Sequence, residues 1–348
     1  MSFEVTIRPS GHQFTVKKDE LILDAALRQD ISFPYGCRNG ACGNCLGKII
    51  SGDISYPEGL PVSLSEEDQA KGDALFCSAI AESSLEIEVP EIADNEVEVQ
   101  ILPARITLLH KLSHDVMEME LALPKGKRLQ FNAGQYIEFL LKDDKKRAFS
   151  LANSPIDDEN LKLHLRLIEG GLFTTYVFNG MKEKTLVRIH GPLGTFFIRG
   201  DSERPLIFIA GGTGFAPIKS MVEQLIAEDN QREIHFYWGV RAKEDLYSNE
   251  LAEKWTEEYK NIHYIPVLSI PKESDQWQGR EGFVHQAVAD DFSDLSGFDV
   301  YMAGPPPMIH AAKAQFNQQG LPNEQIFSDA FDFSADSQKN KNKTVFQQ

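Results

Sequence analysis

The sequence predicts three successive domains of different fold class: a small mixed-sheet domain, a strand-rich domain, and an α/β domain with a parallel sheet. Short alternating strands surround one helical segment in the first quarter of the chain, and six further short strands follow. After Pro205, continuous apolar strands alternate with helical stretches, which is typical of βαβ units. A length of 348 residues is enough for three domains.

The first domain is predicted to span residues 1–92. Strand-like runs at 3–9, 12–18, 46–50 and 84–89 surround a helical segment at 20–29, and a short helix is predicted after Ser65, where Asp68 completes a capping pattern. A linker from Pro90 to Glu96 would end this domain.

The second domain is predicted over residues 97–200, and the third over 204–332. The second contains six short strands with turn signals between them and one helical piece at 173–181, which indicates a barrel or a sandwich. In the third, buried strands at 205–210, 234–240, 262–269 and 299–305 are each followed by a helical stretch or turn. The polar tail, 333–348, is expected to be disordered.

The charge distribution excludes several classes of function. The net charge is −17, and residues 1–97 hold 7 Lys/Arg against 17 Asp/Glu, whereas residues 98–200 hold 15 against 12. No basic footprint for nucleic acid is present. No apolar run reaches the length of a membrane span, and the N-terminus lacks a signal-peptide pattern, so we expect a cytoplasmic protein without membrane insertion. Two interpretations of the excess of acidic residues stay open. It serves solubility, or the acidic first domain binds a more basic partner or neighbouring domain.

The run "PYGCRNGACGNC", Pro34 to Cys45, is the most specific motif. Its cysteines have the spacing C-x4-C-x2-C, and the fourth cysteine follows after 31 further residues. This spacing is that of plant-type [2Fe–2S] loops, and the glycines within it permit a tight fold around a small cluster. Zinc is the main alternative and disulfides a remoter one. The predicted ligands are Cys37, Cys42, Cys45 and Cys77.

The strand-rich domain contains the runs "RAFSLAN" (147–153), "GGLFTTYV" (170–177) and "GPLGTFF" (191–197). Exposed N–H groups at Gly170–Thr174, where a helix begins, can hold a phosphate, and Arg147 adds a cation for the same anion. Phe149 offers an aromatic face and Ser150 a hydroxyl. Each run alone is weak, because a Gly-Gly pair commonly just caps a helix and a strand arginine is commonly solvated.

The α/β domain contains "IFIAGGTGFAPI" (207–218), a glycine turn between a buried strand and a helix. Gly211, Gly212 and Gly214 permit close approach of a ligand, and the helix N-terminus favours a pyrophosphate. The run is not G-x-G-x-x-G, so the ordinary Rossmann fingerprint does not apply. Two further strand ends, at 238–247 and 302–308, are expected at the same crevice.

Together these motifs resemble a known family. The cysteine loop resembles the plant-type ferredoxin domain, a β-grasp fold, and the later runs resemble the flavin barrel and NAD(P)H domain of the ferredoxin–NADP reductase superfamily. The resemblance implies an antiparallel β-barrel that binds FAD, with Arg147 at the flavin phosphate and Ser150 near the flavin N5. Phe149 stands where Tyr is usual. The pyrophosphate contacts would be Gly170, Gly171 and Thr174.

For the nicotinamide coenzyme, the resemblance implies Thr213 beside the nicotinamide, and it makes Ser150 and Thr213 the candidate catalytic residues. Ala303 replaces the Cys of the family's last motif. No extra Arg/Lys pair for a 2′-phosphate is evident, which favours NADH over NADPH. The resemblance also implies that Arg241 and Tyr247 lie near the adenosine end. The implied coenzyme contacts are Gly211, Gly212, Thr213, Gly214, Arg241, Tyr247, Gly304 and Pro305.

The whole chain resembles reductase components of multicomponent oxygenases and the CDP-6-deoxy-Δ3,4-glucoseen reductase branch of the same superfamily. This implies electron flow from NADH through FAD and the [2Fe–2S] cluster to a protein acceptor, a dehydrase or an oxygenase component. Acidic residues within 58–73 and 82–96 are candidates for docking that acceptor. The alternatives are a redox-sensing regulatory subunit and a self-sufficient quinone or ferric reductase.

Overall fold

The computed structural model describes residues 1–92, 97–143 and 145–331, so the predicted disordered tail lies outside the described residues. The chain separates into two compact units. One comprises Met1–Glu96 with Gly194–Phe196, and the other comprises Val97–Leu193 with Phe197–Gln348. The second unit contains both the strand-rich domain and the α/β domain, and the exact domain boundaries stay predictions.

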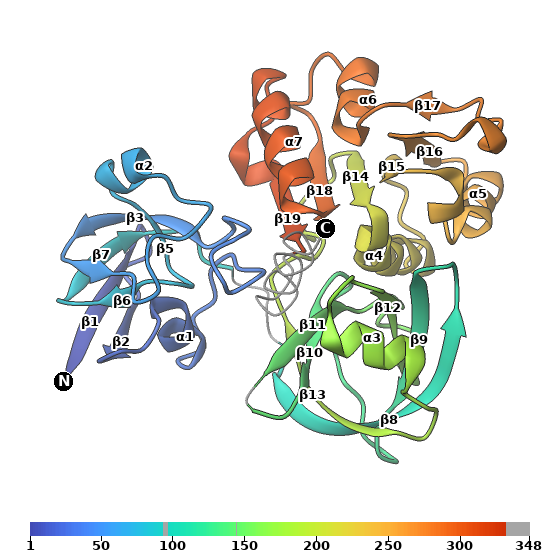
Figure 1. Ribbon diagram of the computed structural model, residues 1–348. Coiled ribbons are helices and arrows are strands. Elements are labelled where there is room, and N and C mark those ends of the chain that lie inside the picture. Colours follow the sequence, from blue (N-terminus) through green and yellow to red (C-terminus); the bar gives the residue numbers. More distant parts are fainter. Residues whose placement is uncertain (93–96, 144, 332–348) are drawn as a thin grey trace, which may run out of the picture. The chain divides into compact units, whose positions relative to one another are not determined.

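The first unit is built on a five-stranded mixed sheet (Figure 1). In sheet order its strands are β2 (Gln13–Lys17), β1 (Ser2–Arg8), β7 (Leu85–Glu88), β3 (Leu46–Ser51) and β5 (Asp73–Leu75). Helix α1 (Ile22–Leu27), helix α2 (Glu66–Ala70) and the small pair β4 (Ile54–Ser55) and β6 (Ile80–Ala81) complete it. Strands β1 and β7 run parallel and the other neighbours antiparallel. The β-grasp expectation is confirmed.

The predicted capping of α2 is also confirmed. The hydroxyl of Ser65 accepts a hydrogen bond from the N–H of Asp68 (3.1 Å) and donates one to the Asp68 carboxylate (2.6 Å). This side chain satisfies one of the N–H groups that a helix start leaves without an acceptor.

The strand-rich domain is a closed antiparallel barrel. Its sheet order is β11 (Lys146–Ser150), β10 (Tyr136–Leu140), β13 (Leu186–Leu193), β8 (Gln100–Lys111), β9 (Val116–Ala122) and β12 (Asn160–Arg166), with helix α3 (Leu172–Asn179) between β12 and β13. An antiparallel bridge between Leu151 and Leu163 joins the two edges of this sheet. The sequence allowed a barrel or a sandwich, and the bridge makes it a barrel.

The α/β domain is a six-stranded parallel sheet. Its order is β17 (Arg280–Glu281), β16 (Ile262–Leu268), β15 (Ile234–Val240), β14 (Leu206–Gly211), β18 (Asp299–Gly304) and β19 (Ile326–Ala330). Helices α4 (Phe215–Ala227) and α5 (Asn249–Glu258) cover one face, and α6 (Val284–Asp291) and α7 (Pro306–Gln318) the other (Figure 1). Short 3-10 turns occur at Gly212–Gly214, Lys243–Asp245, Glu273–Asp275 and Asn323–Gln325.

The strand order reverses between β14 and β18. From β14 the chain first adds β15, β16 and β17 on one side, and then returns to add β18 and β19 on the other. In open α/β sheets, ligands bind outside the carboxyl ends of the strands at such a switch point. The glycine turn that follows β14 and the Gly304–Pro305 step that follows β18 both lie there, as the sequence predicted.

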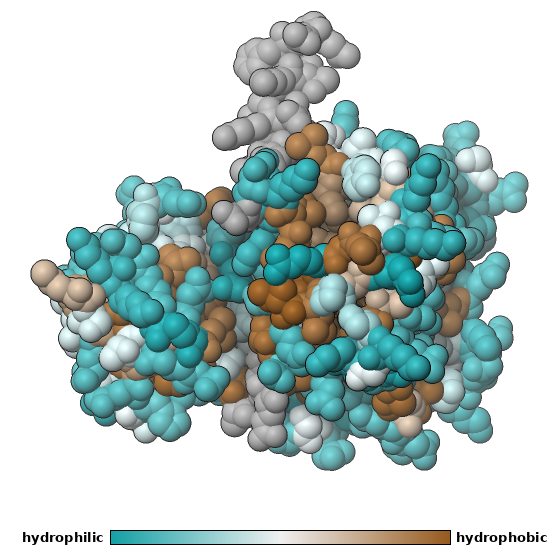
Figure 2. All heavy atoms as spheres, turned by 90° about the horizontal axis from the view of Figure 1, so that it is seen from below, coloured by the Kyte–Doolittle hydropathy of each residue, from teal (hydrophilic) through white to brown (hydrophobic). Residues whose placement is uncertain are grey.

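Within the described residues no helix is long and apolar enough to cross a membrane. The face of the molecule drawn in Figure 2 is mostly hydrophilic, and its hydrophobic residues are most concentrated near the middle of the view.

Gly214 is expected to be essential for the switch point. A Cβ built on Gly214 would overlap the carbonyl oxygen of Ala303 in the neighbouring strand, far inside van der Waals contact. Gly214→Ala should therefore lower the free energy of unfolding by at least about 3 kcal/mol, measured by urea denaturation of the purified protein. Gly297→Ala is the matched control, because a Cβ there meets nothing within 4 Å, and it should cost less than about 0.5 kcal/mol. Equal stabilities would refute the packing argument.

Candidate electron-transfer site

The four cysteines form one site in the first unit. All are free thiols; Cys42, Cys45 and Cys77 are buried, and Cys37 is partly exposed. Backbone N–H groups point at the sulfurs: Cys42 donates to Cys37 Sγ (3.3 Å), Asn44 to Cys42 Sγ (3.4 Å) and Cys77 to Cys45 Sγ (3.4 Å). Such N–H···S contacts stabilise negative charge on the sulfurs, which suits thiolate ligands.

The thiol pKa values show that the sulfurs interact in two pairs. A hydrogen bond with the Cys42 thiol lowers the pKa of Cys37 to about 6, and a hydrogen bond with Cys45 lowers that of Cys77. The pKa values of Cys42 and Cys45 rise, because each thiol hydrogen-bonds its partner and is buried. Charge on Cys42 further raises the pKa of Cys45. A convergent four-sulfur donor set of this kind fits an iron–sulfur cluster.

The backbone of the cysteine loop needs its glycines. Gly40 has φ +77°, and a Cβ there would lie 2.7 Å from Pro61 Cβ and 2.9 Å from Ser78 Oγ. Arg38 also takes a positive φ, 58°, and its guanidinium donates to the carboxylate of Asp24 on α1 (2.5 Å). The cation at Arg38 is therefore shared with a carboxylate, rather than offered to the cluster alone.

Strand β11 carries the predicted flavin residues. The guanidinium of Arg147 donates to the carbonyl of Lys146 (2.7 Å), while the ring of Phe149 packs against Phe139 and Phe173, with centroids 5.8 and 5.7 Å away. Phe149 is thus anchored between a neighbouring strand and α3. Whether its remaining surface stacks on a flavin stays a prediction.

The start of α3 has the geometry that the glycine pair predicted. Gly170 takes φ +75°, and Gly171 is the N-cap of the helix. The hydroxyl of Thr174 accepts from the N–H of Ile168 (3.1 Å) and donates to the carbonyl of Gly171 (3.4 Å). Thr174 therefore braces the turn from within, and the helix N-terminus supplies the N–H groups suited to a phosphate.

Asp329 is a residue that motif analysis missed. The Ser150 hydroxyl donates to the Asp329 carboxylate (3.3 Å), and both side chains are buried. The two residues are 179 positions apart, one on the barrel and one on the last strand of the parallel sheet. Only the packing of β19 against the barrel brings them together.

Each glycine of the turn after β14 makes a different close approach. A Cβ on Gly211 would lie 2.7 Å from Met308 Sδ, and one on Gly212 would lie 2.6 Å from Arg166 Nη1. Gly212 also has φ +55°. Gly304, with φ +153°, lies beside Gly211, since a Cβ on it would be 3.0 Å from Gly211 Cα. The structure thus brings the predicted coenzyme residues on β14 and β18 together.

Arg166 is a second missed residue. Its guanidinium, on β12, donates to Asp115 (2.7 Å) and pairs with Asp245 (3.5 Å) beside the glycine turn. His114 lies 3.8 Å from Asp115 and 3.9 Å from Asp245. The alternation on β12, where buried Leu161, Leu163 and Leu165 line the barrel, could have shown that Arg166 faces outward, but not what it meets.

The two residues predicted at the adenosine end differ in environment. Arg241 is exposed directly after β15. The Tyr247 hydroxyl instead shares a hydrogen bond with His164 Nδ1 on the barrel (3.1 Å), and its ring meets Trp238 edge-on. Burial raises the pKa of Tyr247 well above its usual value. An adenosine contact for these residues stays a prediction.

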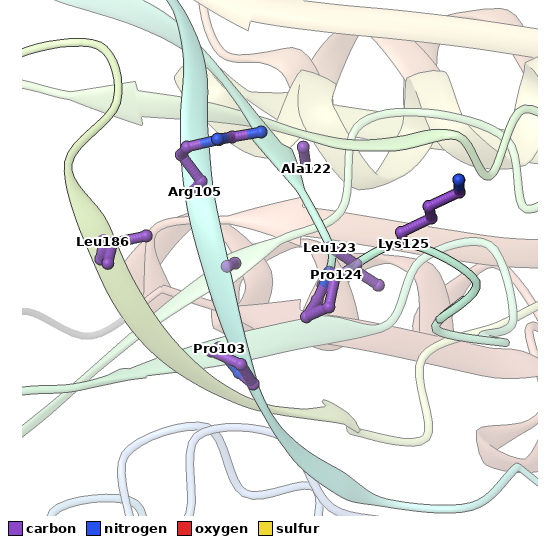
Figure 3. Close-up of a pocket in the computed structure, with 8 residues that line it drawn as sticks. Pro103, Arg105, Ala122, Leu123, Pro124, Lys125 and Leu186 are labelled. Carbon is purple, nitrogen blue, oxygen red and sulfur yellow. The ribbon is translucent and has the colours of Figure 1, made fainter.

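A hollow of about 230 Å³ lies on the outer face of the barrel (Figure 3). Pro103 and Arg105 of β8, Lys125 and Leu186 are among its lining residues. None of the predicted cofactor residues lines it, and the lining contains no carboxylate, histidine or thiol. It carries no functional assignment.

The match to known domain families follows the order of the three folds. The model of the 2Fe-2S iron-sulfur cluster binding domain matches residues 5–82, that of the oxidoreductase FAD-binding domain 103–198, and that of the oxidoreductase NAD-binding domain 208–314. The fold and these matches define an iron–sulfur flavoprotein oxidoreductase that uses NAD(P)H. The cluster, FAD and NAD(P)H expectations are confirmed, and the zinc alternative is set aside.

Relatives that align with almost the whole chain show which oxidoreductases it is similar to. The chain is 42% identical over 334 residues to the CDP-6-deoxy-L-threo-D-glycero-4-hexulose-3-dehydrase reductase of Yersinia pestis, covering 95% of this chain and 99% of the relative. It is 35% identical to the phenol 2-monooxygenase reductase component DmpP of Pseudomonas, covering 97% and 96%. The crystal structure of the Amycolatopsis cytochrome P450 reductase GcoB is similar, with TM-score 0.77 and 29% identity over 94% and 98% of the two chains. The chain belongs to this family of electron-transfer reductases.

A buried histidine makes stability depend on pH. Burial lowers the pKa of His164, whose Nε2 lies 3.6 Å from the Glu118 carboxylate. The unfolded chain therefore binds this proton more readily, so stability is complete above about pH 6.5 and falls as the pH drops toward the lowered pKa. We expect the melting temperature to fall between pH 7.5 and 5.5, and to fall less in His164→Phe. His110→Phe, at an exposed position on β8, should keep the wild-type slope. Equal slopes in all three proteins would contradict the assignment.

Proposed function

We propose that this protein passes electrons from NADH to a dehydrase partner in deoxysugar synthesis. The similarity to the Yersinia dehydrase reductase over 95% of the chain supports the choice of a dehydrase over an oxygenase component. The observation that carries the proposal is the presence, in one chain, of a four-thiol site and a coenzyme crevice. NADH gives two electrons as a hydride and an iron–sulfur cluster accepts one, so bound FAD would split the pair.

The residues proposed to hold the flavin lie on β11 and at the start of α3. Arg147 would pair with the flavin phosphate, Phe149 would stack, and the N–H groups at Gly170, Gly171 and Thr174 would bind the pyrophosphate. Ser150 would hydrogen-bond near the flavin N5; because its hydroxyl proton is donated to Asp329, its oxygen would act there as the acceptor.

The residues proposed to bind the coenzyme surround the switch point. Thr213 would lie beside the nicotinamide, and Gly211, Gly212, Gly214, Gly304 and Pro305 would admit the dinucleotide backbone. Orientation of the two reacting rings, rather than a side-chain acid or nucleophile, would supply the rate. This explains why Ala303, fully buried, can stand where the wider family has Cys.

Charges near the ends of β15 and β16 favour NADH over NADPH. Lys272 is occupied by Glu244 (2.6 Å), and the Asp275 carboxylate accepts from the N–H groups of Lys272 (2.9 Å) and Lys243 (3.3 Å). Arg241 lies just before the 3-10 turn Lys243–Asp245, which also carries the carboxylates of Glu244 and Asp245. A second phosphate on the ribose would meet repulsion there.

The proposed docking surface of the acceptor is the loop beside the cysteines. The N–H and hydroxyl of Ser63 donate to the carbonyls of Gly40 and Ala41, which ties the loop to the cluster region. Val62, which directly precedes Ser63, is 94% exposed, and Leu60 is also exposed. Glu58 and Glu66 flank these apolar side chains. The partner that fits this loop is a protein whose docking surface has an apolar centre and a basic rim.

The second acidic stretch, 82–96, is less suited to docking. Glu82 accepts from Ser55, Glu86 pairs with Arg8, and Glu91 pairs with His12. Residues 93–96 lie outside the described residues. In the stretch 58–73, Glu67 and Asp68 pair with Lys71, so Glu58 and Glu66, for which the described residues show no ion pair, are the stronger candidates.

NADH in excess of one equivalent, added without oxygen, should bleach both flavin and cluster colour, because two electrons reduce the flavin and the cluster takes a third. In Cys42→Ser, cluster colour and reduction of the dehydrase should be lost, because one of the four sulfur ligands is removed, while NADH-to-flavin reduction and NADH–ferricyanide turnover persist. These are measured by absorbance spectroscopy and steady-state kinetics. If wild-type flavin is not bleached by NADH, the proposed function is wrong.

Charge-reversal variants test the proposed docking surface. Glu58→Lys combined with Glu66→Lys should slow reduction of the dehydrase about tenfold at low salt and flatten its salt dependence, because the rim would repel a basic partner. NADH–ferricyanide turnover should stay unchanged. Glu250→Lys, an exposed acid on α5, is the control. An unaltered rate of dehydrase reduction in the double variant would contradict the proposed docking surface.

A further inference from the structure

We propose that Trp238 is a positioning residue for the coenzyme: its indole N–H holds the carbonyl of Gly212, so that the N–H of Thr213 faces the dinucleotide. The indole nitrogen donates to Gly212 O at 2.9 Å, across 26 residues and between neighbouring strand ends. The inference rests on the proposed coenzyme site at this turn.

The indole is held rigidly. Trp238 is fully buried on β15. One face stacks on Phe215 at 4.2 Å and 21°, and Tyr247 meets the ring edge-on at 5.1 Å and 86°. A donor fixed by two neighbouring rings loses little further freedom when it forms its hydrogen bond.

The orientation of one peptide unit follows from that bond. The Gly212 carbonyl also accepts from the N–H of Phe215, in the 3-10 turn that opens α4. In a trans peptide the carbonyl and the following N–H point in opposite directions. With the Gly212 oxygen held toward Trp238 and Phe215, the Thr213 N–H points the other way, out of the helix start, where an anion is favoured.

Glycine makes this restraint necessary. Gly212 takes φ +55°, in the left-handed region, and a glycine moves between backbone conformations more readily than any other residue. Two side chains confine it: Trp238 at its carbonyl, and Arg166 against its α-carbon. One belongs to the parallel sheet and the other to the barrel.

The restraint continues into the barrel. Tyr247 is held in place by its own hydroxyl, which shares a hydrogen bond with His164 Nδ1. The other ring nitrogen of His164, Nε2, faces Glu118 on the neighbouring strand β9. His164 also stacks parallel to Phe215, at 7° and 6.2 Å. The barrel that would bind flavin therefore buttresses the indole that orients the coenzyme turn.

The competing explanation is that Trp238 only fills the core. Trp255 provides the matched control, because it is buried, lies on α5 and stacks on the same Phe215 ring at 6.0 Å and 14°. Within the described residues, no hydrogen bond joins Trp255 to the glycine turn. A core-filling role predicts similar effects of Trp→Phe at both positions.

The test compares Trp238→Phe with Trp255→Phe in the full-length protein. Losing one hydrogen bond that orients a pyrophosphate donor should raise the dissociation constant for NAD⁺, measured calorimetrically, about 3- to 10-fold in Trp238→Phe only. The KM for NADH should rise by the same factor while kcat changes less than about twofold, because binding of the pyrophosphate is equal in ground and transition states.

A variant that fails to fold does not end the test. Site-specific replacement of Trp238 by benzothienylalanine keeps the shape of the ring and replaces only the N–H by sulfur, and it should reproduce the weaker NAD⁺ binding. Unchanged NAD⁺ affinity in either Trp238 variant, or an equal loss in Trp255→Phe, overturns the inference and leaves the proposed function intact. If the wild-type protein itself does not bind NAD⁺, the proposed coenzyme site fails instead.

Discussion

The coenzyme half of the molecule depends on one close backbone approach, that of the turn after β14 to the end of β18. Gly214 lies against the Ala303 carbonyl, and Gly211 lies against Gly304 and Met308, so neither position has room for a side chain. This contact aligns the carboxyl ends of two strands that the chain order separates by almost a hundred residues. The crevice at the switch point exists because the two backbones can approach this closely.

The barrel and the parallel sheet act on this crevice together. Arg166 lies against Gly212, Ser150 reaches Asp329, and His164 holds Tyr247 through its hydroxyl. Each of these contacts joins the barrel to the α/β domain. The polar face that β12 turns away from the barrel core thus packs against the α/β domain, whereas the alternation of the strand alone would suggest a solvated surface.

The cysteine loop is self-contained by comparison. Its sulfurs are surrounded by N–H groups of the same loop and of Cys77, and its glycines are required by neighbours within the first unit, such as Pro61 and Ser78. This locality is the reason that a spacing of four cysteines identified the site, whereas the flavin and coenzyme runs were informative only in combination.

The sequence by itself determined the three fold classes, the capped helix at Ser65, the four-cysteine loop and the glycine turns, because each depends on the spacing of residues close together in the chain. Only the tertiary structure decided that the barrel closes through Leu151 and Leu163, that Ser150 meets Asp329, and that Trp238 donates to Gly212. These contacts depend on strand order and register, which set the neighbours of a side chain across long separations and which no local pattern encodes.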